Sequence, residues 1–195
     1  ERISATSWNL AIINFLDGPF LPTNTTSTTL TLGGTSGSVT VTASSIVGIN
    51  GGTGFQTTDV NRYIRWKDPA GDWTWMEITA RTSTTVVTAT ILGPNASATT
   101  ATADWRLGVW SITTGFPAAV TFFQDRLYFG GGVSYPQRLD GSNTGDYDNF
   151  APSDPDGTVL DSNAVAFTLN ANQVNVIRWL TDDEKGLIIG TVGGE

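Results

Sequence analysis

The sequence predicts an all-β fold, and three observations lead to that prediction. Threonine contributes 31 of the 195 residues, serine 14 and glycine 22, whereas the strong helix formers glutamate and lysine number only four and two. β-branched residues favour strands, and glycine and serine favour turns. Several segments also alternate threonine or serine with an apolar residue, which is the period-two pattern of a half-buried strand. No segment approaches the roughly 18 apolar residues of a membrane-spanning helix.

Residues 1–24 are predicted to form an apolar segment or linker. Trp8–Phe15 fits a short helix and an extended strand equally well, and Asp17-Gly18-Pro19 marks a turn after it. The chain lacks an initiator methionine and ends directly after an apolar run. We therefore expect it to be a piece of a longer polypeptide.

Residues 25–103 are predicted to form a small Thr-rich β-sandwich or barrel. In Ser38–Ser44, for example, valine and alanine fall on one face while threonine and serine fall on the other. Gly- and Pro-containing turns separate the strand-like runs, which are short enough and numerous enough for a small sandwich or barrel. The expected strands are Thr28–Leu32, Ser38–Ser44, Tyr63–Lys67, Trp73–Ala80 and Thr84–Leu92.

Residues 104–195 are predicted to form an incomplete propeller-like β region. Short strands separated by Gly- and Asp-rich turns are typical of propeller blades, although no repeat of fixed period is found here. Gly130-Gly131-Gly132 is interpreted as a flexible strand end, because no helix-forming segment follows it. The expected strands are Ala119–Phe123, Arg126–Gly130, Ala164–Leu169, Val174–Leu180 and Gly186–Val192.

Composition and charge exclude several classes of function. The chain has no cysteine and no histidine, which excludes a Ser-His-Asp triad, a thiolate nucleophile and a structural zinc site. The net charge of −8 argues against a phosphate-binding surface. The segment from Asp140 to Asp161 holds six acidic residues and no basic residue, and such an acidic wall would repel DNA and let it slide.

Calcium is the one metal for which the sequence offers candidate ligands. Asp154, Asp156 and Asp161 supply hard oxygen ligands in an Asp-x-Asp arrangement. The segment lacks the glutamate and the spacing of an EF-hand, and it contains Pro155. The alternative interpretation is a solvated loop without a metal, and no other cofactor is expected.

Paired carboxylates are the remaining acid–base groups. Two carboxyl groups across a sugar-binding cleft would suit a glycosidase, with tryptophan rings as stacking faces. The acids lie beside Gly, Pro, Asn or another acid, however, which favours a role in turns. We therefore expect no enzymatic activity and no catalytic residue. The acidic groups considered are Asp146 with Asp148, Asp154 with Asp156, and Asp182 with Asp183 and Glu184.

The region from residue 105 to residue 195 carries an ordered set of motifs, which are Trp105–Ser111, Thr113–Pro117, Val120–Gly131, Tyr135–Gln137, Asp140–Ser142, Thr144–Phe150, Val174–Leu180 and Leu187–Glu195. This set resembles the tail nozzle proteins of short-tailed phages, also called tail tubular protein B. The Asp17–Pro22 segment followed by a Thr-rich β insertion is similar as well. A whole nozzle subunit is several times longer than this chain.

The resemblance implies a structural virion protein of the phage tail. Nozzle proteins form a ring, typically of six copies, below the tail adaptor; the ring lets DNA out and attaches fibres or spikes. The expected partners of the chain are therefore other copies of itself, adaptor and fibre or spike proteins, and passing DNA that is bound without sequence specificity. The alternative is a carbohydrate-binding or adhesin-like β module of a phage or bacterial surface protein, which would need several tryptophan rings exposed on one face.

Overall fold

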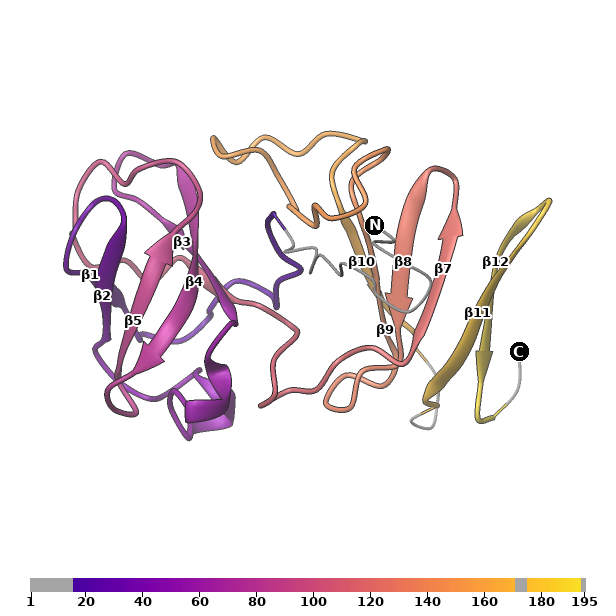
Figure 1. The fold of residues 1–195 in the computed structure, drawn as a ribbon, viewed down its shortest axis with the longest axis horizontal. Helices are drawn as coiled ribbons and strands as arrows, with labels where there is room; N and C mark the ends of the chain where they lie inside the picture. Colours follow the sequence, from indigo (N-terminus) through magenta and orange to yellow (C-terminus); the bar gives the residue numbers. More distant parts are fainter. Residues whose placement is uncertain (1–15, 171–174, 194–195) are drawn as a thin grey trace, which may run out of the picture.

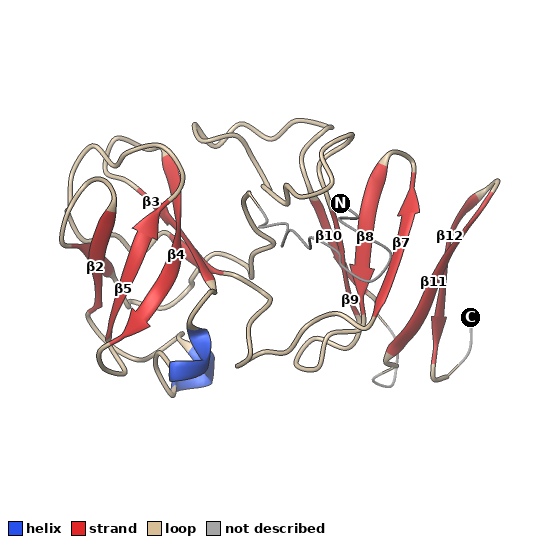
Figure 2. Ribbon diagram, viewed as in Figure 1, coloured by secondary structure: helices blue, strands red, loops and turns tan. Residues whose placement is uncertain are grey.

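The computed structural model describes residues 16–170 and 175–193 and confirms the all-β prediction (Figure 1). A curled sheet lies at one end of the molecule, a second sheet lies beside it, and a hairpin lies at the far end (Figure 2). The only helical turns in the described residues are two short 3-10 helices, η1 (Asn50–Gly52) and η2 (Thr57–Asp59). Neither is long or apolar enough to cross a membrane.

The Thr-rich region forms one antiparallel six-stranded sheet with the strand order β1-β2-β5-β4-β3-β6. Along each strand, alternate side chains point into the core. In β2, for example, valine and alanine are buried, and serine and threonine are exposed. The buried side chains form a single apolar cluster that includes Trp66 and Trp105. The strands are β1 (Leu30–Leu32), β2 (Ser38–Ala43), β3 (Tyr63–Lys67), β4 (Trp73–Arg81), β5 (Val86–Ile91) and β6 (Trp105–Leu107).

The two edges of this sheet meet, so that it curls toward a barrel. Leu30 of β1 and Thr102, just before β6, exchange both backbone hydrogen bonds, at 2.9 and 3.1 Å. The indole N–H groups of two buried tryptophans form further hydrogen bonds at this junction between the two sheet edges. Trp66 donates to the Leu30 carbonyl at 3.1 Å, and Trp105 donates to the Thr28 carbonyl at 2.9 Å. Buried indole nitrogens thereby obtain the partners that they need.

The structure differs from the predicted domain boundaries at residues 24/25 and 103/104. Strand β6 pairs with β3, so the first sheet continues past residue 103 to Leu107. The described part of the predicted linker also belongs to this sheet, because the Leu21 and Asn24 N–H groups donate to the carbonyls of Leu107 and Trp105 at 2.8 Å each. The predicted helix or strand at Trp8–Phe15 lies outside the described residues.

The second sheet is a four-stranded antiparallel meander in the order β10-β9-β8-β7. The hairpin of β11 and β12 packs against it through a shared apolar cluster of Ala119, Tyr128, Leu139, Ile177 and Leu180. Propeller blades are four-stranded sheets, and the propeller-like arrangement of this region stays a prediction. The strands are β7 (Ala119–Phe123), β8 (Arg126–Gly130), β9 (Arg138–Gly141), β10 (Val165–Thr168), β11 (Ile177–Asp183) and β12 (Gly186–Thr191).

Gly131, in the predicted flexible strand end, fixes the approach of the hairpin to the meander. Its φ is +75°, and a Cβ at this position would overlap the Ile177 carbonyl oxygen. We expect Gly131→Ala to lower the free energy of unfolding by about 1–3 kcal/mol, because both the conformation and the space require glycine. The matched control is Gly132→Ala, since the atom nearest to its Cβ, the Tyr135 carbonyl oxygen, is 3.8 Å away. Urea denaturation of both variants checks this, and equal midpoints would contradict it.

Candidate binding pocket between the two sheets

The candidate site lies on the outer face of the six-stranded sheet. In β3, Ile64 and Trp66 point into the core, so Tyr63 and Arg65 point the other way. Strand β4 pairs with β3 in register and adds its own outward residues to the same face, which are Trp73, Trp75 and Glu77. This outer face is therefore rich in aromatic and charged side chains.

Two segments from elsewhere in the chain cover this face. The Arg65 guanidinium donates from Nη2 to the Ser153 carbonyl at 2.7 Å and to the Ser153 Oγ at 3.1 Å. The backbone N–H of Trp73 donates to the Pro155 carbonyl at 2.5 Å. From the N-terminal side, the Phe20 ring lies 5.9 Å from the Arg65 guanidinium carbon. The two sheets are thus joined through specific polar contacts.

Trp73 is the centre of a cationic cluster at this junction. The guanidinium carbons of Arg106 and Arg65 lie 5.3 and 5.4 Å from its ring centroid, and the Lys67 ammonium lies 5.9 Å from it. The ring faces of tryptophan attract cations most strongly among the aromatic side chains. Burial lowers the pKa of Arg65 and of Arg106, and the negative charge of Asp17 opposes that shift in both.

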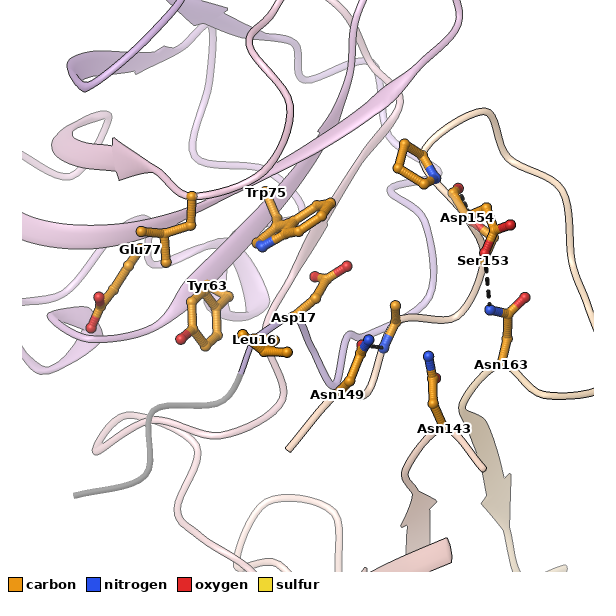
Figure 3. Close-up of a pocket in the computed structure, with 13 residues that line it drawn as sticks. Leu16, Asp17, Tyr63, Trp75, Glu77, Asn143, Asn149, Ser153, Asp154 and Asn163 are labelled. Atoms are coloured by element: carbon orange, nitrogen blue, oxygen red, sulfur yellow. Dashed lines mark hydrogen bonds between the residues drawn. The ribbon is translucent and has the colours of Figure 1, made fainter. Parts of the chain in front are cut away.

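A pocket of about 490 Å³ lies beside this cluster (Figure 3). Two of its lining residues, Leu16 and Leu92, are 53% and 47% exposed, so its wall reaches the protein surface. The figure shows side chains from the barrel strands, from the N-terminal segment and from the acidic segment converging on one space. The lining residues are Leu16, Asp17, Tyr63, Trp75, Glu77, Leu92, Asn143, Asn149, Ala151, Ser153, Asp154, Pro155 and Asn163.

Asp17 is the most unusual group in the pocket. It is only 1% exposed, and neither of its carboxylate oxygens has a hydrogen-bond partner among the described residues. Burial raises its pKa to about 7, and the nearby Arg65 opposes the rise without reversing it. Ionised Asp17 is therefore costly to the fold.

Two further polar atoms in the pocket wall also lack protein partners in the described part of the chain. They are the Trp75 indole Nε1 and the Asn143 Oδ1. Two other side-chain amides in the wall form hydrogen bonds within the protein. Asn149 donates to Asp146 at 3.0 Å, and Asn163 donates to Asp154 at 3.3 Å. The unpartnered atoms have almost no accessible surface, so they are enclosed by the protein itself.

The structure does not gather the predicted calcium ligands into one site. Asp154 faces the pocket and accepts from Asn163, whereas exposed Asp156 accepts from the Thr158 N–H of its own turn at 2.8 Å. Asp161 contributes its backbone carbonyl to Arg126 at 2.5 Å. No group of three or more acidic side chains suited to a metal is found within residues 16–170 and 175–193.

The other acidic pairs lie mainly in turns. Asp146 accepts from Asn149 three residues later, and Asp183 accepts from the Glu184 N–H at the β11–β12 turn. Asp140 differs, because it is buried and forms an ion pair with Arg138 at 2.8 Å. Burial raises the Asp140 pKa and the Arg138 contact opposes that rise. Part of the acidic segment is therefore structural rather than a free negative surface.

The tryptophans do not form an exposed row in the described structure. Trp66, Trp73 and Trp105 are buried, and Trp110 packs edge-on against Phe129 at 5.0 Å between ring centroids. Trp179 is 41% exposed, and it lies on the distant hairpin.

Sequence reasoning did not identify Asp17 as a site residue. Its position in an apolar stretch before Gly18 was the available signal.

No model of a known protein family matches the chain, and no curated protein sequence is significantly similar to it.

Proposed function

We propose that the chain is a non-enzymatic structural component of the virion, located in the tail of a short-tailed phage. Copies of it form a ring, typically of six, below the adaptor. The ring lets DNA leave and carries tail fibres or spikes. Supporting this are the ordered motifs from Trp105 to Glu195 and the succession of a barrel-like sheet, a four-stranded meander and a packed hairpin.

An exposed apolar patch on β7 carries the proposal. Val120 and Phe122 are 56% and 57% exposed on the outermost strand of the meander. The Tyr147 ring extends this patch, meeting the Phe122 ring edge-on at 5.0 Å between centroids. Exposed apolar side chains gathered in one patch are the features of a surface that another chain covers.

A second apolar patch supplies the other contact surface that a ring requires. Ile112, Phe116 and Val133 are 69%, 56% and 80% exposed. The loops that carry them are joined, because the Ser134 N–H donates to the Thr114 carbonyl at 3.0 Å. A ring repeats a head-to-tail contact, which needs two different patches on each subunit. The β7 patch of one copy against this loop patch of the next copy meets that requirement.

Acidic residues on the surface suit the passage of DNA. Asp125, Asp156 and Asp161 are exposed, and the chain carries a net charge of −8. A negative wall repels the phosphate backbone and so lets DNA slide. We propose that these residues face the channel of the ring.

The ring proposal is tested by a charged substitution in the β7 patch. We expect Phe122→Glu to convert assembled protein to monomer, because a carboxylate cannot be buried unpaired in an apolar contact. The matched control is Val159→Glu, which introduces the same charge at an exposed residue outside both patches. Multi-angle light scattering measures the mass of each variant. Equal masses for wild-type protein and Phe122→Glu would refute the role of this patch.

The alternative function is a carbohydrate-binding or adhesin-like module, and one feature supports it. That feature is the pocket beside Trp75, where three protein polar groups lack partners within the described residues. The absence of an exposed tryptophan row in the described structure removes the stacking platform that this function was expected to use.

A further inference from the structure

The accessible charge of the pocket between the two sheets is negative. Three of its lining residues are acidic, and none of those that the structure describes is basic. Glu77 and Asp154 are half-buried, so they reach solvent, and neither forms an ion pair within the described residues. Burial, and after it the negative charge of Glu77, raises the pKa of Tyr63 to about 12. Such a pocket attracts cations and repels anions.

Two opposite charges lie behind the pocket wall, out of reach of any ligand. The Asp17 carboxylate oxygens and the Arg65 Nε and Nη1 atoms have almost no accessible surface and no hydrogen-bond partner within the described residues. The two groups interact electrostatically, because Arg65 opposes the rise that burial causes in the pKa of Asp17. When Asp17 is ionised, the two charges offset each other. The charge that a ligand meets therefore comes from Glu77 and Asp154.

These two accessible carboxylates belong to opposite ends of the pocket wall. Glu77 lies four residues along β4 from Trp73, whose N–H donates to the carbonyl of Pro155, the neighbour of Asp154. At a rise of about 3.3 Å per residue, the two ends are roughly 13 Å apart along the strand. Figure 3 shows Trp75 between Glu77 and Asp154. An elongated ligand could therefore reach both acids.

Between its ends the wall is apolar and carries little net charge. Arg65 stands directly opposite Trp75 across β3 and β4, so this enclosed cation and its counter-charge lie near the middle. The half-buried rings of Trp75 and Tyr63 and the exposed Leu16 and Leu92 line the pocket. Methylene groups pack well against such a surface. The volume of about 490 Å³ lies within the roughly 300–1,000 Å³ that is usual for small-molecule sites.

We propose that the pocket binds a linear aliphatic diamine, with one ammonium group at Glu77, the other at Asp154 and the methylene chain across Trp75. Spermidine and diamines of similar length belong to this class. The inference goes beyond the proposed tail function and does not depend on ring assembly.

Isothermal titration calorimetry tests the proposal at a pH above 7, where Asp17 is ionised because its pKa is about 7. The probes are spermidine and straight-chain diamines with terminal amino groups, from diaminopropane to diaminodecane. We expect saturable binding that is strongest near diaminooctane. Octylamine, with a single ammonium group, should bind about three- to fivefold more weakly, which is the value of one partly exposed ion pair. Octanediol and suberate keep the chain length without positive charge, and neither should bind.

Variants locate the binding in this pocket. Glu77→Gln and Asp154→Asn each remove the charge at one end, so each should weaken binding of diaminooctane about three- to fivefold. In both variants the diamine should lose its advantage over octylamine. The matched control is Glu184→Gln, which removes the same charge from an exposed residue on the distant hairpin and should bind like the wild-type protein. Circular dichroism confirms that each variant is folded.

Three results would overturn the proposal. The first is that no diamine binds to the folded wild-type protein. The second is that octylamine or octanediol binds as tightly as diaminooctane, which would leave the second carboxylate without a role. The third is that Glu184→Gln weakens binding as much as Glu77→Gln, which would assign the attraction to the net charge of the chain. None of these readouts depends on the mass of the assembly, so failure here is distinct from failure of the ring proposal.

Discussion

The Asp59→Ala variant is expected to lose about 3–5 kcal/mol of unfolding free energy, because it leaves a buried arginine without its counter-charge. Asp59 and Arg62 are 0% and 1% exposed, and their side chains form an ion pair at 2.9 Å. Burial lowers the pKa of Arg62, and Asp59 is the main group that opposes this shift. Removing Asp59 therefore leaves the cost of burial in place and takes away its compensation.

The surrounding hydrogen bonds increase the expected loss. Asp59 Oδ2 accepts from the Asn50 amide at 2.7 Å and from the Gln56 N–H at 2.8 Å, which orders both 3-10 helices. Arg62 Nε donates to the Gly108 carbonyl at 2.7 Å and so ties β3 to the chain that follows β6. One substitution disturbs all of these connections.

Guanidinium denaturation measures this effect. The matched control is Asp72→Ala, which removes an exposed aspartate from the turn before β4 and should change the stability by less than about 0.5 kcal/mol. Adding Arg62→Met to Asp59→Ala should restore part of the loss, because the unpaired charge is then gone. A loss below about 1 kcal/mol in Asp59→Ala would show that the pair is not buried as described.

Asp17 is expected to make the protein less stable as the pH rises from about 4 to about 7. Its pKa is raised from 3.8 to about 7 in the folded chain, so within this window the folded state holds a proton that the unfolded state has lost. The resulting stabilisation is complete below the unfolded pKa and disappears as the pH passes the folded pKa. Above pH 7, the folded chain carries the full cost of a buried carboxylate.

Asp17→Asn should remove this pH dependence. The amide resembles the protonated acid, so the variant should match the wild-type protein near pH 4 and exceed its stability above pH 7 by up to about 4 kcal/mol. Chemical denaturation at a series of pH values measures the difference between the two proteins. Asp72→Asn is the matched control and should follow the wild-type curve. Parallel curves for wild-type protein and Asp17→Asn would contradict the burial of Asp17.

Local alternation was enough to predict every strand except two short ones. The predicted ranges Tyr63–Lys67, Ala119–Phe123 and Arg126–Gly130 coincide with β3, β7 and β8. Strands β6 and β9 were not predicted, whereas β1 and β10, which have the same lengths, lie within longer predicted runs. Each forms by pairing with a neighbouring strand, β6 with β3 and β9 with β8, and the local sequence does not reveal that pairing. The domain boundary at residue 103 was misplaced for the same reason.

The candidate site could not be predicted from the sequence for a related reason. Asp17 meets Trp75 and Asn143 only after the N-terminal segment and the acidic segment have folded over β3 and β4. The calcium prediction rested on the spacing of Asp154, Asp156 and Asp161, and spacing does not fix where side chains point. In the folded chain, a neighbouring amide and a turn N–H take up two of those carboxylates.

The most direct test of the proposed tail function is negative-stain microscopy of the protein, alone and mixed with adaptor rings of a short-tailed phage. The proposal predicts closed rings that stack on the adaptor, with the β7 patch buried between neighbouring copies. Particles that keep the 20.7 kDa mass of a single chain and ignore the adaptor would contradict it.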